Sequence, residues 1–95
     1  MSNTVIAHFK AKPESVSEFA DIMATIKTEL PKAEGCSGVD VQRGLEDKTQ
    51  FILIEKWDSK EQHANYIQQI RASEDWGKIV ACLAEEPRSG YFDAF

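Results

Sequence analysis

The chain has 95 residues, of which 42% are hydrophobic and 28% charged, and its formal net charge is −5. This length allows one domain, spanning residues 1–95, and the composition is that of a globular protein and excludes a disordered chain. The 11 Lys and Arg residues form no basic stripe, so we expect no nucleic-acid partner. The apolar stretches are far shorter than a membrane span, so we expect no membrane partner.

The cysteines and the first residues indicate a compartment. Cys36 and Cys82 lie far apart in different kinds of segment and suggest no disulfide framework, so we expect two free thiols in a reducing environment. Residues 1–4 have neither the positive start nor the apolar run of a secretory signal. We therefore predict a cytoplasmic protein.

The first predicted elements are a strand and a helix. Apolar residues recur at every second position of residues 4–12, which is the period of a strand. Pro13 suits the first turn of the helix that follows, and Pro31 ends that helix after residue 30. Ser15 and Glu18 have the spacing of a capping box, although Pro13 also fits an earlier start. One apolar stripe follows the helix and contains Val16, Phe19, Ala20, Met23, Ile26 and Leu30.

The central strand is the most informative segment. Residues 34–38 read as a loop, residues 39–43 as a short strand, and residues 44–49 as the turn of a hairpin to a strand over residues 50–57. One face of that last strand carries Phe51, Leu53, Glu55 and Trp57, and the other carries Ile52, Ile54 and Lys56. A strand with one solvated face alternates between apolar and polar residues, and this one does not. We therefore expect its own helices to cover one face and a second copy of the chain to cover the other.

The remaining chain predicts two helices and a strand. Asp58 and Ser59 resemble helix N-caps, with Glu61 and Gln62 at capping-box distance. After a break near Ser73, a third short helix follows, and residues 88–95 read as the last strand. The spacing i, i+3, i+4, i+7 places residues on one face of a helix. It recurs in the second helix at His63, Tyr66, Ile67 and Ile70, and in the third at Trp76, Ile79, Val80 and Leu83. The order β-α-β-β-α-α-β predicts an α+β, ferredoxin-like fold with a four-stranded antiparallel sheet.

Chemical motifs are absent, and a cluster of side chains takes their place. The sequence has no GxGxxG, P-loop, HExxH or CxxC motif, and two isolated histidines do not make a zinc site. Aromatic and polar residues gather where the 50–57 strand meets the following helices, as in small-molecule pockets. The candidates are, for catalysis, His63, Tyr66 and Glu55, and, for substrate binding, Trp57, Trp76 and His8. The alternative role is core packing for Trp57, Tyr66 and Trp76. For His63 it is a capped or half-exposed position on the helix, for Glu55 a structural bridge, and for His8 a contact with the partner subunit.

The segment FILIEKWDSKEQ, residues 51–62, resembles the signature of the antibiotic biosynthesis monooxygenase family: an apolar strand, Glu-x-Trp and a Ser-x-Glu helix start. The opening IAHFKAKPESVSEF and the loop Glu-Gly-Cys-Ser-Gly are also similar to that family. The resemblance implies a dimeric α+β barrel in which two sheets face each other. It further implies oxidation of a phenolic or quinol substrate by O₂ without flavin, haem or metal, in a pocket that Trp57 lines.

Two departures limit this resemblance. Family members often carry a histidine where this chain has Tyr66, and here His63 lies one turn earlier. Either the two residues divide that role, or the activity differs or is lost. The haem-degrading branch requires a first-strand asparagine and a helix histidine, and this chain has Ala7 or His8 and no matching histidine. The open alternative to an enzyme is a non-catalytic dimeric module that binds a small apolar ligand.

Overall fold

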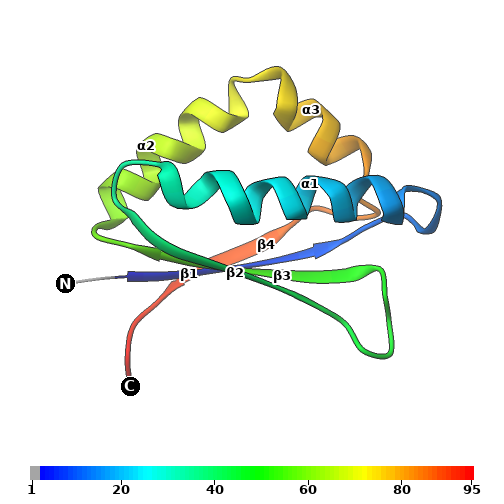
Figure 1. The fold of residues 1–95 in the computed structure, drawn as a ribbon, viewed down its shortest axis with the longest axis horizontal. Helices are drawn as coiled ribbons and strands as arrows, with labels where there is room; N and C mark the ends of the chain where they lie inside the picture. Colours follow the sequence, from blue (N-terminus) through cyan, green and yellow to red (C-terminus); the bar gives the residue numbers. More distant parts are fainter. Residues whose placement is uncertain (1–2) are drawn as a thin grey trace.

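A computed structural model describes residues 3–95 of the chain. Figure 1 shows the α-helices of this part together on one side of a twisted sheet. In chain order, the elements are β1 (Asn3–Lys10), a 3₁₀ turn (Pro13–Ser15), α1 (Val16–Glu29), a second 3₁₀ turn (Leu30–Lys32), β2 (Cys36–Arg43), β3 (Gln50–Trp57), α2 (Lys60–Arg71), α3 (Glu74–Ala81) and β4 (Arg88–Phe92). The predicted order of helices and strands is confirmed.

The sheet has the strand order β2-β3-β1-β4, and every neighbouring pair is antiparallel. The strand β1 lies between β3 and β4, so Val5 pairs with Glu55 on one side and with Tyr91 on the other. Val39 of β2 completes this row across the sheet. The predicted ferredoxin-like α+β fold is therefore confirmed, and the register places side chains from strands far apart in sequence next to one another.

The two faces of β3 carry the residues that the alternation predicts. The face toward the helices buries Phe51, Leu53, Glu55 and Trp57, and the opposite face carries Ile52 and Ile54, which are half-buried. We call the second surface the open face. Its other members come from the same rows of the sheet and include Ile6 and His8 of β1 and Gly90 and Phe92 of β4.

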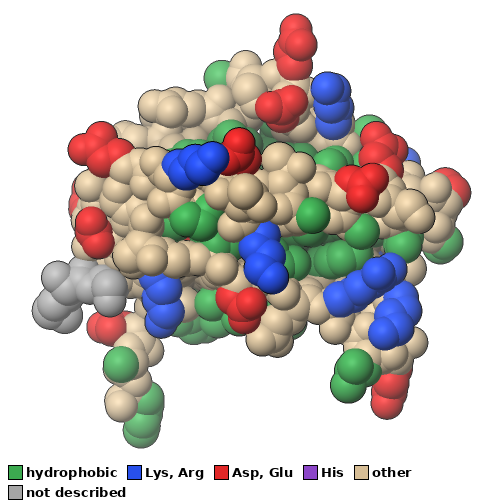
Figure 2. Space-filling view, in the orientation of Figure 1, with side chains coloured by type: hydrophobic (Ala, Val, Ile, Leu, Met, Phe, Trp, Pro, Cys, Tyr) green, Lys and Arg blue, Asp and Glu red, His purple; other side chains and the backbone are tan. Residues whose placement is uncertain are grey.

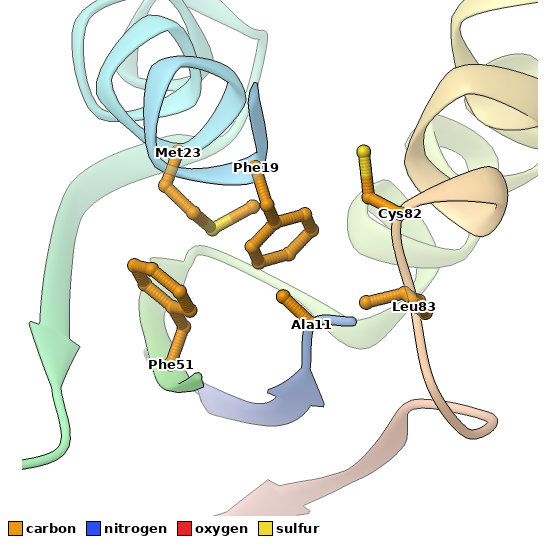
Figure 3. Close-up of a cluster of buried hydrophobic side chains, with 6 residues drawn as sticks. All are labelled: Ala11, Phe19, Met23, Phe51, Cys82 and Leu83. Carbon is orange, nitrogen blue, oxygen red and sulfur yellow. The ribbon is translucent and has the colours of Figure 1, made fainter. Parts of the chain in front are cut away.

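Two clusters of buried side chains join the helices to the sheet. Figure 3 shows the larger one, in which Phe19 and Met23 of α1 pack over Phe51 of β3, while Cys82 and Leu83 approach from the segment after α3. The ring centroids of Phe19 and Phe51 are 5.1 Å apart in an edge-to-face arrangement, which aromatic pairs favour. The second cluster lies at the other end of the sheet and contains Val5, Leu30, Cys36 and Trp57. Both cysteines are buried free thiols, as predicted.

Several boundaries differ from the predicted ones. The strand β2 begins at Cys36, three residues early, with an irregularity between Cys36 and Gly38. The strand β4 ends at Phe92, which pairs with Thr4 of β1, rather than at residue 95. The Ser15 side chain caps nothing; Pro13 starts a 3₁₀ turn instead.

The connection from β3 to α2 is fixed by two local features. The Oγ atom of Ser59 accepts a hydrogen bond from the Gln62 backbone N–H at 3.2 Å, which is the predicted cap. Gly35 has a φ of 87°, and its carbonyl accepts a hydrogen bond from the Asp58 N–H at 2.8 Å. Glycine adopts this conformation without the strain that a side chain would add, so Gly35 holds the start of β2 against the turn into α2.

The surface of the described residues carries charges of both signs. Figure 2 shows acidic and basic side chains spread over one face, with hydrophobic side chains gathered between α1 and the sheet. Within residues 3–95, every helix is too short or too polar to cross a bilayer.

Candidate active site

A cavity of about 1020 Å³ lies between the helices and the sheet. This volume is at the upper end of the range for small-molecule sites, about 300–1,000 Å³. Its floor is the helix-facing side of β1, β3 and β4, and its walls come from α1 on one side and from α2 and α3 on the other. The apolar wall residues include Ile22, Ile26, Ile67, Ile70, Trp76 and Ile79.

The carboxyl group of Glu55 is the first polar feature of the floor. Glu55 is only 4% exposed, and its Oε1 accepts a hydrogen bond of 2.8 Å from Nε1 of Trp57, which is fully buried. Burial raises the pKa of Glu55, and the hydrogen bond from Trp57 partly offsets this rise. The result is a carboxyl group that holds its proton more strongly than an exposed glutamate does.

His63 and Tyr91 form the second polar feature. His63 lies in the first turns of α2 and is 7% exposed, and its Nδ1 is 2.8 Å from the hydroxyl oxygen of Tyr91 on β4. The direction of this hydrogen bond depends on the histidine tautomer. Burial lowers the pKa of His63, so its imidazole is neutral at pH 7. The Lys60 ammonium lies 4.8 Å from the centre of the Tyr91 ring, in cation–π geometry.

Tyr66 completes the polar group. It lies one turn after His63 on α2, and its ring centroid is 5.5 Å from that of Trp57. Burial raises the pKa of Tyr66, and the negative charges that Glu55 and Cys36 carry once they are ionised raise it further. Its phenol therefore stays protonated at neutral pH. We call Glu55, His63, Tyr66 and Tyr91 the polar end of the cavity.

The structure brings four of the six predicted site residues to the cavity wall. Glu55, His63, Tyr66 and Trp76 all border the cavity. Trp57 lies behind the wall, where its ring contacts those of His63 and Tyr66, with centroids 5.4 and 5.5 Å away. The expectation that Trp57 lines the pocket is thus corrected: complete burial in the second core cluster makes it a support for the residues that do.

The expectation for His8 is also corrected. Successive side chains of a strand point to opposite faces, so His8 lies on the open face when Ala7 lies on the cavity floor. It pairs with Ile52 and Arg88 and borders a small polar hollow of about 90 Å³. His8 therefore lies outside the lining of the cavity between sheet and helices.

Tyr91 is a residue of the site that the sequence did not predict. The signal was present, because Ser89 and Tyr91 alternate with Arg88 and Gly90 and share the floor with Val5 and Ala7. The strand was too short and its flanking residues too irregular for the alternation to assign a face. The pairing of β4 with β1 decides which face Tyr91 occupies. This pairing is a tertiary contact, so the local sequence does not reveal it.

No metal site accompanies this cluster in the described part of the chain. Among residues 3–95, no group of three or more His, Cys, Asp or Glu side chains is close enough to hold a metal ion. The polar end has one carboxyl group, one imidazole and two phenols. These groups can donate and accept protons around a buried ligand.

Comparison with protein families decides the classification. The family model described as antibiotic biosynthesis monooxygenase matches residues 3–81, which is most of the chain. This protein belongs to the antibiotic biosynthesis monooxygenase family. The resemblance found in the sequence is confirmed at the level of the family. Comparison with curated proteins finds no match.

Several solved structures share this fold. A conserved protein from Methanosarcina mazei Go1 is 26% identical, with a TM-score of 0.79 over 97% of this chain and 91% of the other. A Bordetella bronchiseptica protein that carries the family name is 22% identical, with a TM-score of 0.78 over 99% and 97%. SnoaB, a cofactor-independent oxygenase from Streptomyces nogalater, is 15% identical, with a TM-score of 0.81 over 98% and 92%. These similarities establish the shared fold.

Proposed function

We propose that this protein is a cofactor-independent monooxygenase that oxidises a small aromatic, quinol-type substrate with O₂ in the cavity between sheet and helices. The observation that carries the proposal is the polar end: a buried carboxyl group and a buried neutral imidazole in the wall of a mostly apolar cavity. Membership of the family and the cofactor-independent oxygenase SnoaB as a structural neighbour support it.

The first step is removal of a proton from a substrate hydroxyl group. Because burial lowers the pKa of His63, its imidazole is unprotonated and ready to accept that proton. In the tautomer in which Nδ1 donates to Tyr91, Nε2 carries the free lone pair. The resulting phenolate is electron-rich and can reduce O₂ directly, which removes the need for a cofactor.

Protonated groups then stabilise the anion. Burial raises the pKa of Glu55, which favours the protonated form, and in that form the carboxyl group donates a hydrogen bond to the phenolate oxygen instead of repelling it. The phenol of Tyr66 is a second donor, because its pKa is also raised. In a cavity with apolar walls these donors act more strongly than in water.

Tyr91 offers the proton a route to solvent. Its side chain is 42% exposed, whereas the imidazole it contacts is buried. The proton taken up by His63 can therefore leave through the Tyr91 hydroxyl without opening the cavity. For a hydroquinone, the overall reaction inserts one oxygen atom of O₂ into a ring C–H bond and releases the other as water, and the product is the hydroxyquinone.

The test is oxygen uptake by the purified protein, without added cofactor, on a panel of hydroquinones and naphthohydroquinones. We expect turnover that His63→Ala abolishes and Asn65→Ala leaves unchanged, because Asn65 is on the same helix but is exposed. Oxygen uptake that survives His63→Ala at the parent rate would refute the assigned base. If the parent protein, folded as shown by circular dichroism, turns over no member of the panel, the non-catalytic ligand-binding module becomes the better description.

We also propose that the protein acts as a homodimer through the open face. Ile6, Ile52 and Ile54 lie side by side in neighbouring strands of that face, and Phe92 is 51% exposed next to them. An exposed row of apolar side chains on a sheet is stabilised when a second apolar surface covers it. In a two-fold symmetric dimer, the open face of each copy packs against the open face of the other.

A further inference from the structure

The helices α2 and α3 form an arch whose two feet are fixed. Figure 1 shows α2 rising away from the sheet and α3 descending toward it, on the side of the sheet that also carries α1. At the first foot, Tyr66 packs on the second core cluster. At the other foot, the Cys82 carbonyl accepts a hydrogen bond from the Lys12 N–H and the Lys10 carbonyl accepts one from the Ala84 N–H, both at 2.8 Å. Among the described residues, neither helix of the arch packs extensively on α1.

Charged side chains mark the mouth of the cavity between this arch and α1. Those that border the cavity and are exposed come from both sides: Glu18, Asp21 and Glu29 from α1, and Arg71, Asp75 and Lys78 from the arch. The α1 side is wholly acidic, and both bases lie on the arch. Opposite charges therefore lie on opposite sides of the opening.

The ion pairs of the described residues 3–95 leave this opening unbridged. Glu29 pairs with Lys32 at 2.6 Å, and Asp75 is 4.0 Å from Lys78, so each of these pairs stays on one side of the mouth. The guanidinium group of Arg71 lies over the Trp76 ring, 5.5 Å from its centre. The two sides thus carry complementary charges that they do not use on each other in this structure.

The apolar walls beneath the mouth favour closure. The wall residues are half-buried, although they border the interior of the protein: Ile22, Ile26, Ile67, Ile70, Trp76 and Ile79. The open cavity of about 1020 Å³ leaves part of their surface in contact with solvent. If the arch moves toward α1, these side chains cover one another, and the hydrophobic effect favours that movement.

The two core clusters show which parts of the arch and of α1 would meet. Tyr66 packs on the cluster that contains Leu30, just after the end of α1. Cys82 belongs to the cluster that contains Phe19, near the start of α1 (Figure 3). The arch therefore runs antiparallel to α1, and Asp21 lies between its two feet, opposite its unanchored middle.

We propose that the α2–α3 arch is a lid that closes the mouth of the cavity, with Arg71 and Lys78 pairing with Asp21 in the closed state. Closure excludes water from the cavity and so strengthens the hydrogen bonds that the polar end makes there. The inference concerns access to the cavity and holds whatever reaction occurs inside it.

The distance across the mouth measures closure. Nitroxide labels are attached at Ala24→Cys on α1 and Ala72→Cys at the C-cap of α2, because both residues are exposed and lie outside the cavity lining. Cys36 and Cys82 are buried, and a parent sample taken through the same labelling sets their background. Labelled chains are diluted with unlabelled protein, so that double electron–electron resonance reports the distance within one chain. We expect two distances, a longer one for the open arch and a shorter one for the closed arch.

Salt and charge reversal should shift this equilibrium. Between about 0.01 and about 1 M NaCl the Debye length falls from about 30 to about 3 Å, so we expect the ratio of closed to open chains to fall roughly two- to tenfold. Asp21→Lys should lower this ratio at low salt, and so should Arg71→Glu combined with Lys78→Glu, because each replaces attraction with repulsion. All three substitutions together restore opposite charges and should restore the ratio. Lys27→Glu is the control that should leave it unchanged, since Lys27 is exposed on α1 outside the cavity lining.

The outcomes decide the inference independently of the proposed function. A distance distribution that neither salt nor charge reversal changes, whether it has one maximum or two, would overturn the lid. A closed population that Asp21→Lys lowers no more than Lys27→Glu does would overturn it as well. Oxygen uptake does not enter the measurement, so a moving lid can be found in a protein that oxidises no quinol, and a fixed arch in one that does.

Discussion

The indole N–H of Trp57 donates a 2.8 Å hydrogen bond to the carboxyl group of Glu55, two positions earlier on the same face of β3. This pair connects the core to the cavity, because Trp57 is fully buried whereas Glu55 borders the open volume. A buried carboxyl group without a hydrogen-bond partner would destabilise the fold. The Glu-x-Trp spacing therefore has two effects: it stabilises the fold, and it influences the pKa of Glu55.

Replacing Trp57 with Phe tests this coupling. The variant loses the hydrogen bond that lowers the pKa of Glu55, so this pKa should rise further. The loss of a buried hydrogen bond should also lower the free energy of unfolding by about 1–3 kcal/mol. Isotope-edited infrared spectroscopy of the carboxyl group reports the first effect and urea denaturation the second. A carboxyl titration identical to that of the parent would contradict the assigned role.

Glu55→Gln should make stability less dependent on pH. In the folded protein the pKa of Glu55 lies above the ordinary glutamate value of 4.5, so the folded state binds more protons than the unfolded state between the two values. Stability therefore falls as the pH rises from 4.5 through the folded pKa, by about 1.4 kcal/mol for each unit of the difference. The glutamine variant lacks this loss and can still accept the bond from Trp57. Urea denaturation of both proteins across this window gives the comparison; parallel curves would refute it.

Tyr91→Phe removes one hydroxyl group and keeps the ring under Lys60. We expect a loss of about 1 kcal/mol in stability and a slower proton release that lowers turnover roughly tenfold or more. The ¹⁵N chemical shifts of His63 should change, because Nδ1 loses its partner at 2.8 Å. Unchanged shifts would show that the hydroxyl group does not orient the imidazole. A purely structural role would lower stability without altering the pH profile of turnover.

Periodicity along the chain was sufficient to predict most of the fold. The 50–57 strand, its two faces and the shared face of His63 and Tyr66 follow from residue spacing alone, because each strand and helix has a fixed period. The site needed more. His8 was predicted to bind substrate, but alternation along residues 4–12 does not tell which face of β1 the helices cover. Only the helix packing decides this.

The contribution of Tyr91 could not be predicted for a related reason. It reaches His63 from a strand 28 residues further along the chain, on the far edge of the sheet. Such a contact depends on which strand β4 pairs with and in which register, and a shift by one residue would have turned the Tyr91 side chain to the open face.

Two glycines offer a matched pair for stability. Gly35 has a φ of 87°, and a Cβ atom there would approach the Gln62 side chain to 2.5 Å, so Gly35→Ala should cost roughly 1 kcal/mol or more. Gly77 lies in α3, and apart from its chain neighbours and the backbone of its own helix no atom lies within 4 Å of the position that a Cβ would take. Gly77→Ala should therefore raise the free energy of unfolding by about 0.5–1 kcal/mol. Thermal unfolding of both variants measures the difference. Equal shifts in the same direction would contradict the conformational argument.

Ile54→Lys tests the proposed dimer. Ile54 is in the middle of the open face, where it pairs with Ile6 and Asp40 in the neighbouring strands. A lysine there would bury a charge between two sheets, so we expect the dimer to dissociate at least tenfold more readily. Ala24→Lys is the control, since Ala24 is exposed on α1 and remote from that face. Because Ile54 is half-buried in one chain, an isolated domain should tolerate the change far better than an interface does. Sedimentation velocity measures the association of all three proteins, and a parent protein that sediments as a monomer at every concentration would remove the second copy from the proposal.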